Sequence, residues 1–301
     1  MFYNKEEELA ELQKQFQKKE NFFLVAFSEE QQAFVGCMGI LIRKDEAKTK
    51  RWEPLVKEQA SFETVARKLL EEGLTLLKRR GVKRLEISFK YMLDELSSVA
   101  PLLELFNSVG FNEKVPPTKQ FYKQLTEQSS EEIDSIEGNV ITFKTRSHYS
   151  LETFCDLTVQ AFSIIEEDKR IHSWDPIVSN YEHCLELNKC IVAGMFGYSP
   201  PEFWLVAQIE QEPAGILVAF SPKREDGLQV GVIGVLGVHP NFRGRGVAKA
   251  LITTIEKTFL QMGFDYSFVG TPETNKNGVA LYEHLNYIPF QRLIFLQKNL
   301  E

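Results

Sequence analysis

The chain has 301 residues, of which 43% are hydrophobic and 26% are charged, and its net charge at pH 7 is −7. This length accommodates two domains, and the longest apolar run, Val230–Val238, is far too short for a membrane-spanning helix. The N-terminal segment is charged and has no apolar signal core, so we expect a cytoplasmic protein. The four cysteines show no Cys-x-x-Cys and no paired His spacing, which disfavours disulfide and metal-binding roles.

Charge is distributed unevenly along the chain. Residues 1–125 carry 21 Lys and Arg against 19 Asp and Glu, whereas residues 126–301 carry 14 against 23. The acidic second part argues against nucleic-acid binding, which needs a basic surface. It suits a cationic small-molecule substrate, and it equally suits a surface that only keeps the protein soluble.

In chain order, the first half contains one plain helix signal. Ala66–Gly81 is predicted to be a helix that ends at a glycine. Lys48–Lys57 is basic and aromatic, and we interpret it either as a solvated loop or as a patch for a partner or an anionic group. Thr126–Gly138 is polar, acidic and poor in apolar residues, so we predict a linker or an exposed connection there.

The second half is predicted to have the order β-α-α-β-β-β-α-β-α-β. Ser150 is suited to cap the first helix, and Asp175 followed by Pro176 is suited to begin the second. The predicted elements are strands over 139–146, 230–238, 265–270 and 289–297, a hairpin over 202–220, and helices over 150–163, 175–187 and 277–285. A further helix is predicted to follow strand 230–238 after a short loop and to run to about residue 262.

The two halves contain a weak internal repeat. Ala66–Gly81 and Ala248–Gly263 both run from Ala to Gly over sixteen residues, at an offset of 182. Shorter echoes flank both copies in the same order, and they are FFLVAF (22–27) with FWLVAQ (203–208) and LFNSVGF (105–111) with LYEHLNY (281–287). The repeat indicates two similar domains, although the first copy lacks a counterpart of the first strand and helix of the second half.

The segment VHPNFRGRGVAKALI (238–252) has the features of an anion-binding loop. Gly244 and Gly246 let a ligand approach the backbone closely, and the following helix directs its free N–H groups and its dipole at the same space. Arg243 and Arg245 add positive charge in an acidic region, so we expect a ligand that carries phosphate. The loop lacks the glycine spacing of a P-loop and of the dinucleotide fingerprint.

Two motifs resemble those of the GNAT superfamily of N-acetyltransferases. Arg243, Gly246 and Ala248 fit its loop pattern Q/R-x-x-G-x-G/A, and Asn277–Tyr282 supplies its N-x-x-A-L-Y spacing one helix and one strand later. The resemblance covers about residues 139–301 and implies an α/β fold with a mixed, mostly antiparallel sheet flanked by helices. The implied organisation is a degenerate GNAT-like domain at 1–125, a linker at 126–138 and a catalytic GNAT domain at 139–301.

The resemblance also implies acetyl-CoA as the cofactor. In the family the fourth and fifth strands splay apart, and pantetheine pairs with the backbone of the fourth strand, here Val230–Val238. The Leu236 N–H would then face the thioester oxygen, as a catalytic oxyanion donor, and the N–H groups of residues 243–248 would hold the pyrophosphate. The implied cofactor-binding residues are Leu236, Gly237, Val238, Arg243, Gly244, Arg245, Gly246, Val247, Ala248 and Asn277.

Tyr282 is the implied general acid, because a leaving thiolate needs a proton and a phenol still holds one at neutral pH. The alternative is a packing aromatic. Many relatives place a carboxylate on the fourth strand, but Val230–Val238 has no ionisable side chain, so the base is open. His239 is interpreted as a turn residue, and Trp174 as either acceptor pocket or core. Candidate bases, each equally explained as a surface charge, are Glu166, Glu167, Asp168, His172, Asp175 and Glu273.

The repeat predicts a first domain without a cofactor site. In the repeat alignment Ser61–Thr64 replaces Arg243–Gly246, so both glycines and both arginines are missing. Glu63 would repel a pyrophosphate, and Phe106 replaces Tyr282 and has no hydroxyl to donate. An unrelated α/β domain is the alternative interpretation of this half.

The leading hypothesis is a tandem-domain enzyme that transfers acetyl from acetyl-CoA to an amine. Direct attack is expected, without an acyl-enzyme, because no cysteine falls on a motif position. The acceptor would be a small molecule or a peptide amine, neither nucleic acid nor a membrane is expected as a partner, and a homodimer is left open. The alternative is a non-catalytic, CoA-responsive binding or regulatory protein.

Overall fold

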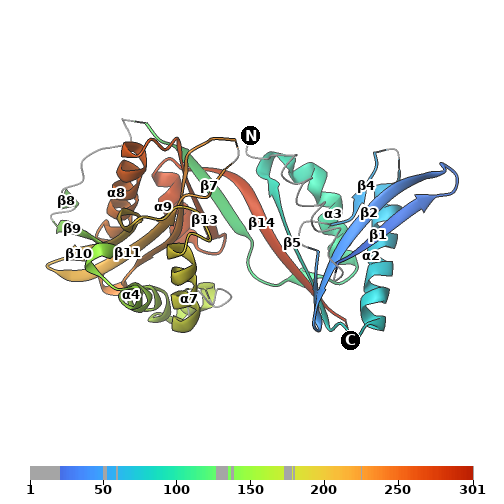
Figure 1. The fold of residues 1–301 in the computed structure, drawn as a ribbon, viewed down its shortest axis with the longest axis horizontal. Helices are drawn as coiled ribbons and strands as arrows, with labels where there is room; N and C mark the ends of the chain where they lie inside the picture. The colour runs from blue at the N-terminus through green and yellow to red at the C-terminus, as the bar shows by residue number, and fades with distance from the viewer. Residues whose placement is uncertain are drawn as a thin grey trace. The chain divides into compact units, whose positions relative to one another are not determined.

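The computed structural model describes residues 21–49, 53–58, 60–126, 135–136, 139–172, 178, 180–224 and 226–300. The chain divides into two compact units (Figure 1). Unit 1 consists of Met1–Thr118 together with Phe290–Glu301, and unit 2 consists of Lys119–Pro289. Each unit has its own hydrophobic core. No helix in the described parts of the chain is long and apolar enough to cross a bilayer.

Unit 1 is a mixed sheet with two helices. Its elements are β1 Asn21–Ser28, β2 Ala33–Arg43, β3 Glu46–Lys48, β4 Leu55–Val56, α2 Phe62–Arg79, β5 Arg84–Met92, α3 Leu96–Ser108, β6 Asn112–Glu113 and β14 Ile288–Asn299. The strand order is β1-β2-β3-β5-β14, and only the β3–β5 pair is parallel. The apolar residues of α2 recur at helical spacing, from Ala66 through Leu70 to Leu77, and are buried against this sheet.

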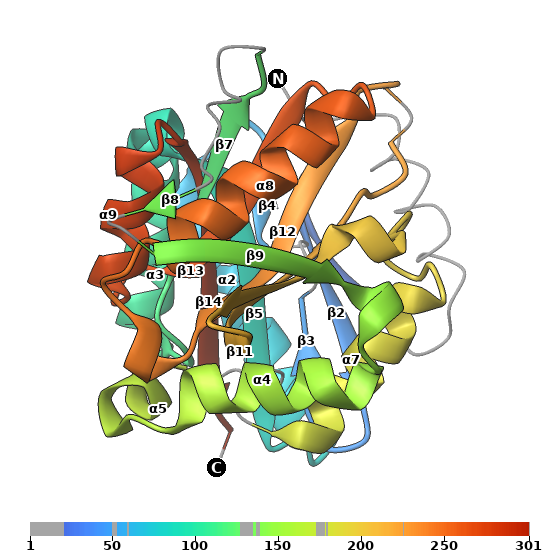
Figure 2. The same ribbon diagram turned by 90° about the vertical axis from the view of Figure 1, so that its left-hand side faces the viewer.

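Unit 2 is built from a larger set of elements. These are β7 Thr118–Gln124, β8 Ser135–Ile136, β9 Asn139–Thr145, α4 Leu151–Ser163, α5 Glu166–His172, α7 Tyr181–Val192, β10 Trp204–Ile209, β11 Glu212–Phe220, β12 Val230–Val238, α8 Val247–Gln261, β13 Tyr266–Pro272 and α9 Lys276–His284. The strand order is β7-β13-β12-β11-β10-β9-β8, and β12 pairs with β13 in parallel. Helix α8 covers one face of this sheet, and α4 with α7 covers the other (Figure 2).

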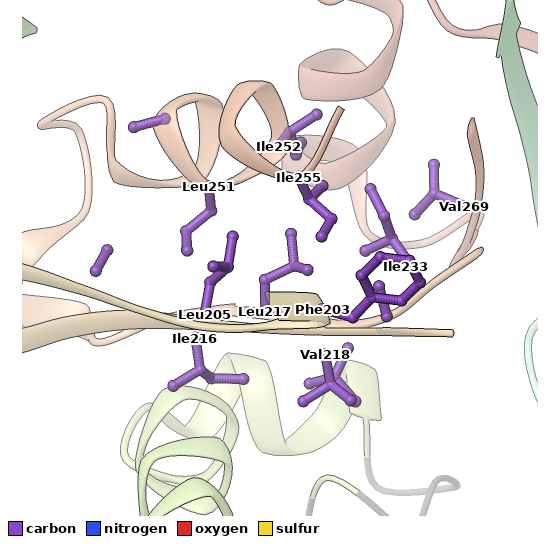
Figure 3. Close-up of a cluster of buried hydrophobic side chains, with 14 of the residues drawn as sticks. Phe203, Leu205, Ile216, Leu217, Val218, Ile233, Leu251, Ile252, Ile255 and Val269 are labelled. Carbon is purple, nitrogen blue, oxygen red and sulfur yellow. The ribbon is translucent and has the colours of Figure 1, made fainter. Parts of the chain in front are cut away.

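The core of unit 2 follows from strand alternation. Successive side chains of a strand point to opposite faces, so Leu217 of β11 faces Leu251 and Ile255 of α8, whereas Ile216 and Val218 point to the opposite face (Figure 3). All five side chains are buried, and each contributes roughly 1.5–3 kcal/mol of hydrophobic stabilisation. The two filled faces hold β11 and β12 in a fixed position beneath the loop that precedes α8.

The last strand of each half of the chain lies in the unit formed by the other half. In β7, Phe121 is fully buried in the core of unit 2, and the following Leu125 N–H donates to the Asp265 carbonyl at 2.9 Å. β14 pairs antiparallel with β5 and buries Ile294 and Leu296 in the core of unit 1. The compact units therefore differ from the sequence-based division into 1–125 and 139–301. An alternating strand pattern predicts a strand but does not identify the sheet that it joins.

The predicted element order of the second half is confirmed from β9 to β14, with α5 as an additional short helix. Of the helix predicted over 175–187, the structure describes α7, which begins at Tyr181, where the side chain of Asn180 accepts a hydrogen bond from the His183 N–H and caps the helix. Asp175, Pro176 and Trp174 lie outside the described residues, as does most of the predicted linker.

Candidate functional site

The loop before α8 has the backbone geometry of an anion-binding site. Gly244 and Gly246 have φ angles of 74° and 76°, which favour glycine, and Gly246 caps α8 in the left-handed conformation. A side chain added at Gly244 would meet no atom within 4 Å, so the space beside it is open. Among the described residues, no hydrogen bond is made by the N–H groups of residues 244–248. These donors are therefore available to a ligand.

The two arginines of the loop have different roles. The guanidinium of Arg243 donates to the carbonyls of Ala161 (2.8 Å) and Val238 (3.2 Å) and forms an ion pair with Asp168 at 2.7 Å. Its backbone N–H donates to the Pro240 carbonyl at 3.3 Å. Arg243 thus ties the loop to β12, α4 and α5, and its guanidinium already has protein partners. The expectation that both arginines face a phosphate stays a prediction.

Arg245 is exposed and lies over the ring of Phe242, with its guanidinium carbon 5.5 Å from the ring centroid. This contact fixes a positive charge on the outer side of the loop without neutralising it. Arg245 is therefore the loop arginine that is free to meet an anion.

Strands β12 and β13 diverge after Ile233, five residues before β12 ends. Their parallel register runs from Val230 opposite Tyr266 to Ile233 opposite Val269 and ends there, although both strands continue. The five residues of β12 from 234 to 238 therefore have one side that is not paired with β13. This divergence is the feature that the family resemblance implied.

The backbone of β12 beyond this point faces the gap. The His239 N–H donates to the Ala214 carbonyl at 2.9 Å, so these residues form a hydrogen-bonded pair of the antiparallel ladder with β11. Hydrogen-bonded and non-hydrogen-bonded pairs alternate along such a ladder, and the register is unbroken from 235 to 238. Leu236 and Val238 therefore direct their N–H and C=O groups away from β11, toward the gap. Gly237 is the residue between them and bonds to β11.

A β-bulge marks the start of this segment. The register between β11 and β12 shifts between Val218 and Ala219, which lie opposite Val235 and Ile233, so Gly234 is an extra residue without a partner in β11. Gly234 is exposed, and sequence reasoning did not single it out. An isolated glycine within a strand pattern is the signal that indicates such a bulge.

Tyr282 lies in α9 and is buried, with 6% of its surface exposed. Its ring packs against Phe121 of β7 and against Tyr287, at centroid distances of 5.6 and 5.9 Å. Burial raises the pKa of its hydroxyl above the ordinary value, so the phenol keeps its proton throughout the physiological pH range. No hydrogen bond to a described residue occupies this hydroxyl. Asn277, in the first turn of the same helix, is exposed.

The candidate bases have different surroundings in the structure. Asp168 is ion-paired with Arg243, and Glu166 is ion-paired with Lys169 at 2.5 Å. The His239 ring accepts a hydrogen bond from the Asn241 N–H and caps a 3₁₀ turn, which confirms it as a turn residue. Glu167 is exposed in α5, Glu273 follows β13, the side chain of His172 is outside the described part, and Asp175 is outside it altogether.

Sequence reasoning missed the residues that β7 brings to this unit. Lys123 forms an ion pair with the buried Glu256 of α8 at 2.7 Å and lies 5.6 Å from the ring centroid of Tyr287. Burial raises the pKa of the Glu256 carboxyl, and the Lys123 ammonium acts against that rise. Together with Phe121, Lys123 connects the first half of the sequence to the surroundings of Tyr282.

The match to a known family covers the part of the chain that contains this site. A model of the acetyltransferase (GNAT) family matches residues 159–287. An acetyltransferase from Yersinia enterocolitica is 38% identical over 100 residues, which cover 33% of this chain and 67% of the relative. One from Pectobacterium atrosepticum is 37% identical over 87 residues, which cover 29% of this chain and 58% of the relative, so less than two thirds of that protein is spanned.

Two solved structures resemble nearly the whole chain. A GCN5-related N-acetyltransferase from Sphaerobacter thermophilus has a TM-score of 0.64 at 17% identity, over 98% of this chain and 85% of that one. A tandem GNAT protein from the clavulanic acid biosynthesis pathway has a TM-score of 0.50 at 12% identity, over 94% and 84%. At such identities the likeness concerns the fold, and it confirms two GNAT-like domains, each with a mixed sheet flanked by helices.

Proposed function

This chain belongs to the acetyltransferase (GNAT) family, and from that premise we propose that unit 2 transfers an acetyl group from acetyl-CoA to a primary amine of a small molecule or peptide. The observation that carries the proposal is the gap between β12 and β13, with the free N–H groups of the loop at its end. The gap offers backbone partners to an extended chain, and the loop offers donors to phosphate. Both are parts of a site for a nucleotide-linked thioester.

The residues present fit this cofactor. The N–H groups of residues 244–248 and the exposed Arg245 would hold the pyrophosphate, and Asn277 would contact the cofactor from α9. Leu236 and Val238 would hold the pantetheine arm through the groups that face the gap, with Gly237 between them. Acetyl-CoA would supply an acetyl group activated as a thioester.

Leu236 is the proposed oxyanion donor. Its N–H faces the gap beside the bulge, and a fixed donor aimed at developing negative charge is often worth about 3–4 kcal/mol of transition-state stabilisation. Two filled layers of side chains hold β12 in place, so the donor is positioned before the substrate arrives.

Tyr282 is the proposed general acid. A new N–C bond forms as the C–S bond breaks, and the departing sulfur takes the phenol proton, which burial keeps on Tyr282. The proton released by the amine nitrogen goes to solvent and restores the phenol. An alkylamine of pKa about 10.4 is neutral in roughly 1 of 2,500 molecules at pH 7, so the acceptor must lose a proton before it attacks.

One observation favours the alternative, a non-catalytic protein that binds CoA. Val230–Val238 has no ionisable side chain, and two of the candidate carboxylates, Glu166 and Asp168, are ion-paired. An enzyme of this design would accept only the neutral amine. Its kcat/KM would then rise about tenfold per pH unit below the pKa of the amine.

Calorimetric titration of acetyl-CoA tests the proposal. The wild type is expected to bind one equivalent, and Gly246→Glu is expected to abolish binding, because a carboxylate would enter the anion site and the left-handed backbone disfavours a side chain. Arg245→Glu, at an exposed position, tests the same site without backbone strain. Thr64→Glu is the matched control, since Thr64 occupies the aligned position and is exposed in the first turn of α2.

Binding lost in both unit 2 variants and retained in Thr64→Glu would support the proposed site. Two equivalents bound by the wild type would contradict the assignment of unit 1 as lacking a cofactor site. No binding by the wild type would overturn the proposal.

A further inference from the structure

An apolar surface lies where α7 and β11 end in unit 2. We call it the aromatic rim, and its members are Val192, Met195, Phe196, Tyr198 and Phe220. The exposed fractions of Met195, Phe196 and Tyr198 are 74%, 41% and 57%. The rings of Phe196 and Phe220 pack with their centroids 5.6 Å apart. Such large side chains gathered at the surface indicate contact with an apolar partner.

Phe220 of the aromatic rim shares one face of the sheet with the bulge, and Phe196 packs against Phe220. Ile216 and Val218 point away from α8 (Figure 3), and Phe220 follows them at the same two-residue spacing along β11. A Cβ added at Gly234 would lie 3.0 Å from Cε1 of the Phe220 ring. The Phe220 ring thus lies against the backbone of the bulge, close to the space that a side chain at Gly234 would need.

The rim lies within reach of the proposed reaction centre. Gly234 is two residues before Leu236, which corresponds to about 6–7 Å along an extended strand. An amine that attacks a carbonyl held by the Leu236 N–H can therefore place a body, on a short linker, against Phe220 and Phe196. The free N–H groups that suit phosphate lie beyond the other end of this segment, before α8.

The charges near the rim disfavour a cationic body. The five rim residues are uncharged, and a depression of about 460 Å³ begins beside them at Gly197 and Tyr198. Among the described residues that line it are Lys223, which is exposed, and Arg224, which forms an ion pair with the neighbouring Asp226. A second ammonium group on the acceptor would meet the exposed Lys223 there and would compete with Arg224 for Asp226.

We infer that the acceptor is an arylalkyl amine, whose ring packs on the aromatic rim while its amine reaches the gap at Gly234. This inference rests on the proposed function and narrows it. It narrows the cationic small-molecule substrate that the acidic second half suits to an apolar amine with a single positive charge. Burying an aromatic ring is worth roughly 1.5–3 kcal/mol, so rings should be preferred by about 10- to 100-fold.

The test compares three amines as acceptors, with release of the CoA thiol as the readout. Phenylethylamine, butylamine and spermidine are assayed with the full chain and acetyl-CoA, after calorimetry has shown acetyl-CoA binding. We expect kcat/KM for phenylethylamine to exceed the other two by about tenfold or more. Phe196→Ala should raise KM for phenylethylamine several-fold and leave the KM for acetyl-CoA and the rate with butylamine unchanged. Phe34→Ala, an exposed aromatic of unit 1, is the matched control.

The outcomes distinguish failure of the proposed function from failure of the proposed acceptor class. If acetyl-CoA does not bind, the proposed function itself fails. If acetyl-CoA binds but spermidine or butylamine is used as well as phenylethylamine, or none of the three is acetylated, the aromatic acceptor is wrong while the cofactor site stands. An equal loss in Phe196→Ala and Phe34→Ala would also overturn the inference.

Discussion

The helices α8 and α2 begin in opposite ways, although they occupy the same place in the two units. α8 starts after Gly246, whose φ of 76° turns free N–H groups toward open space. α2 starts after Ser61, whose φ is −65° and ψ 108°, and its first turn carries Glu63, paired with Arg67 at 3.6 Å. One scaffold can thus be folded with or without an anion site, so the fold alone does not decide the chemistry.

The position of Tyr282 repeats the contrast in the cores. Phe106 of α3 takes the equivalent place in unit 1, where it is fully buried against Phe89 and Phe111. The helices even end alike, because Gly110 and Asn286 both adopt positive φ angles after their last turns. Packing around the ring is kept in both units, whereas only unit 2 has the hydroxyl. The following predictions use this contrast.

The largest effect is expected from Tyr282→Phe. The variant should lower kcat about 10²- to 10⁴-fold, because the leaving sulfur loses its proton donor, while the ring contacts with Phe121 and Tyr287 persist. Calorimetry should show unchanged acetyl-CoA affinity, and thermal unfolding should show an unchanged midpoint. Turnover within a factor of three of the wild type would make Tyr282 a packing aromatic like Phe106.

The second largest effect is expected on the stability of unit 2, from a substitution in β7. Lys123→Met leaves Glu256 buried without its ion-pair partner, which should cost about 3–5 kcal/mol of unfolding free energy. Urea unfolding, followed through the buried Trp204 of unit 2, measures the loss. An unchanged midpoint would contradict the assignment of β7 to the stability of unit 2.

The pH dependence of that variant has a defined sign. Burial raises the pKa of Glu256 in the folded state, so its protonated form is favoured by folding. The associated stability is present below the unfolded pKa and is lost as pH rises through the folded pKa. Lys123→Met should therefore be destabilised less at pH 4 than at pH 8. The double variant Lys123→Met with Glu256→Met should recover most of the loss at both values.

The smallest effect is expected from Ser61→Gly. The Ser61 side chain makes no capping hydrogen bond to the α2 backbone, so the substitution should change stability by only a few tenths of a kcal/mol. It should also confer no acetyl-CoA binding, because Glu63 and the missing glycine geometry remain. A gain of binding in calorimetry would show that unit 1 is separated from a working site by a single residue.

Local patterns predicted the parts of this molecule that depend on neighbouring residues. The glycine spacing before α8 predicted its loop, and the element order of the second half and the missing glycines of the first followed from the sequence as well. These features depend on backbone conformation and helix ends, which a few adjacent residues determine. The resemblance of the loop and of Asn277–Tyr282 to one family then supplied the fold.

The sequence did not predict contacts between residues that are far apart in the chain. Nothing in the alternation of β7 or β14 identifies the sheet that each joins, and the pairing of Arg243 with Asp168 depends on how α5 packs. The bulge at Gly234 arises from register with β11, which a single strand does not encode. The sequence therefore did not show that the guanidinium of Arg243 is paired with Asp168.

The exchanged strands have a consequence for synthesis on the ribosome. Unit 2 receives β7 early, long before the rest of its sheet is translated. Unit 1 has an unpaired edge at β5 until residues 291–299 of β14 emerge, almost 200 residues after β5 itself. An open strand edge invites pairing with other chains. The nascent first half is thus the stage at which this protein is most exposed to aggregation, and at which a chaperone that shields strand edges would help most.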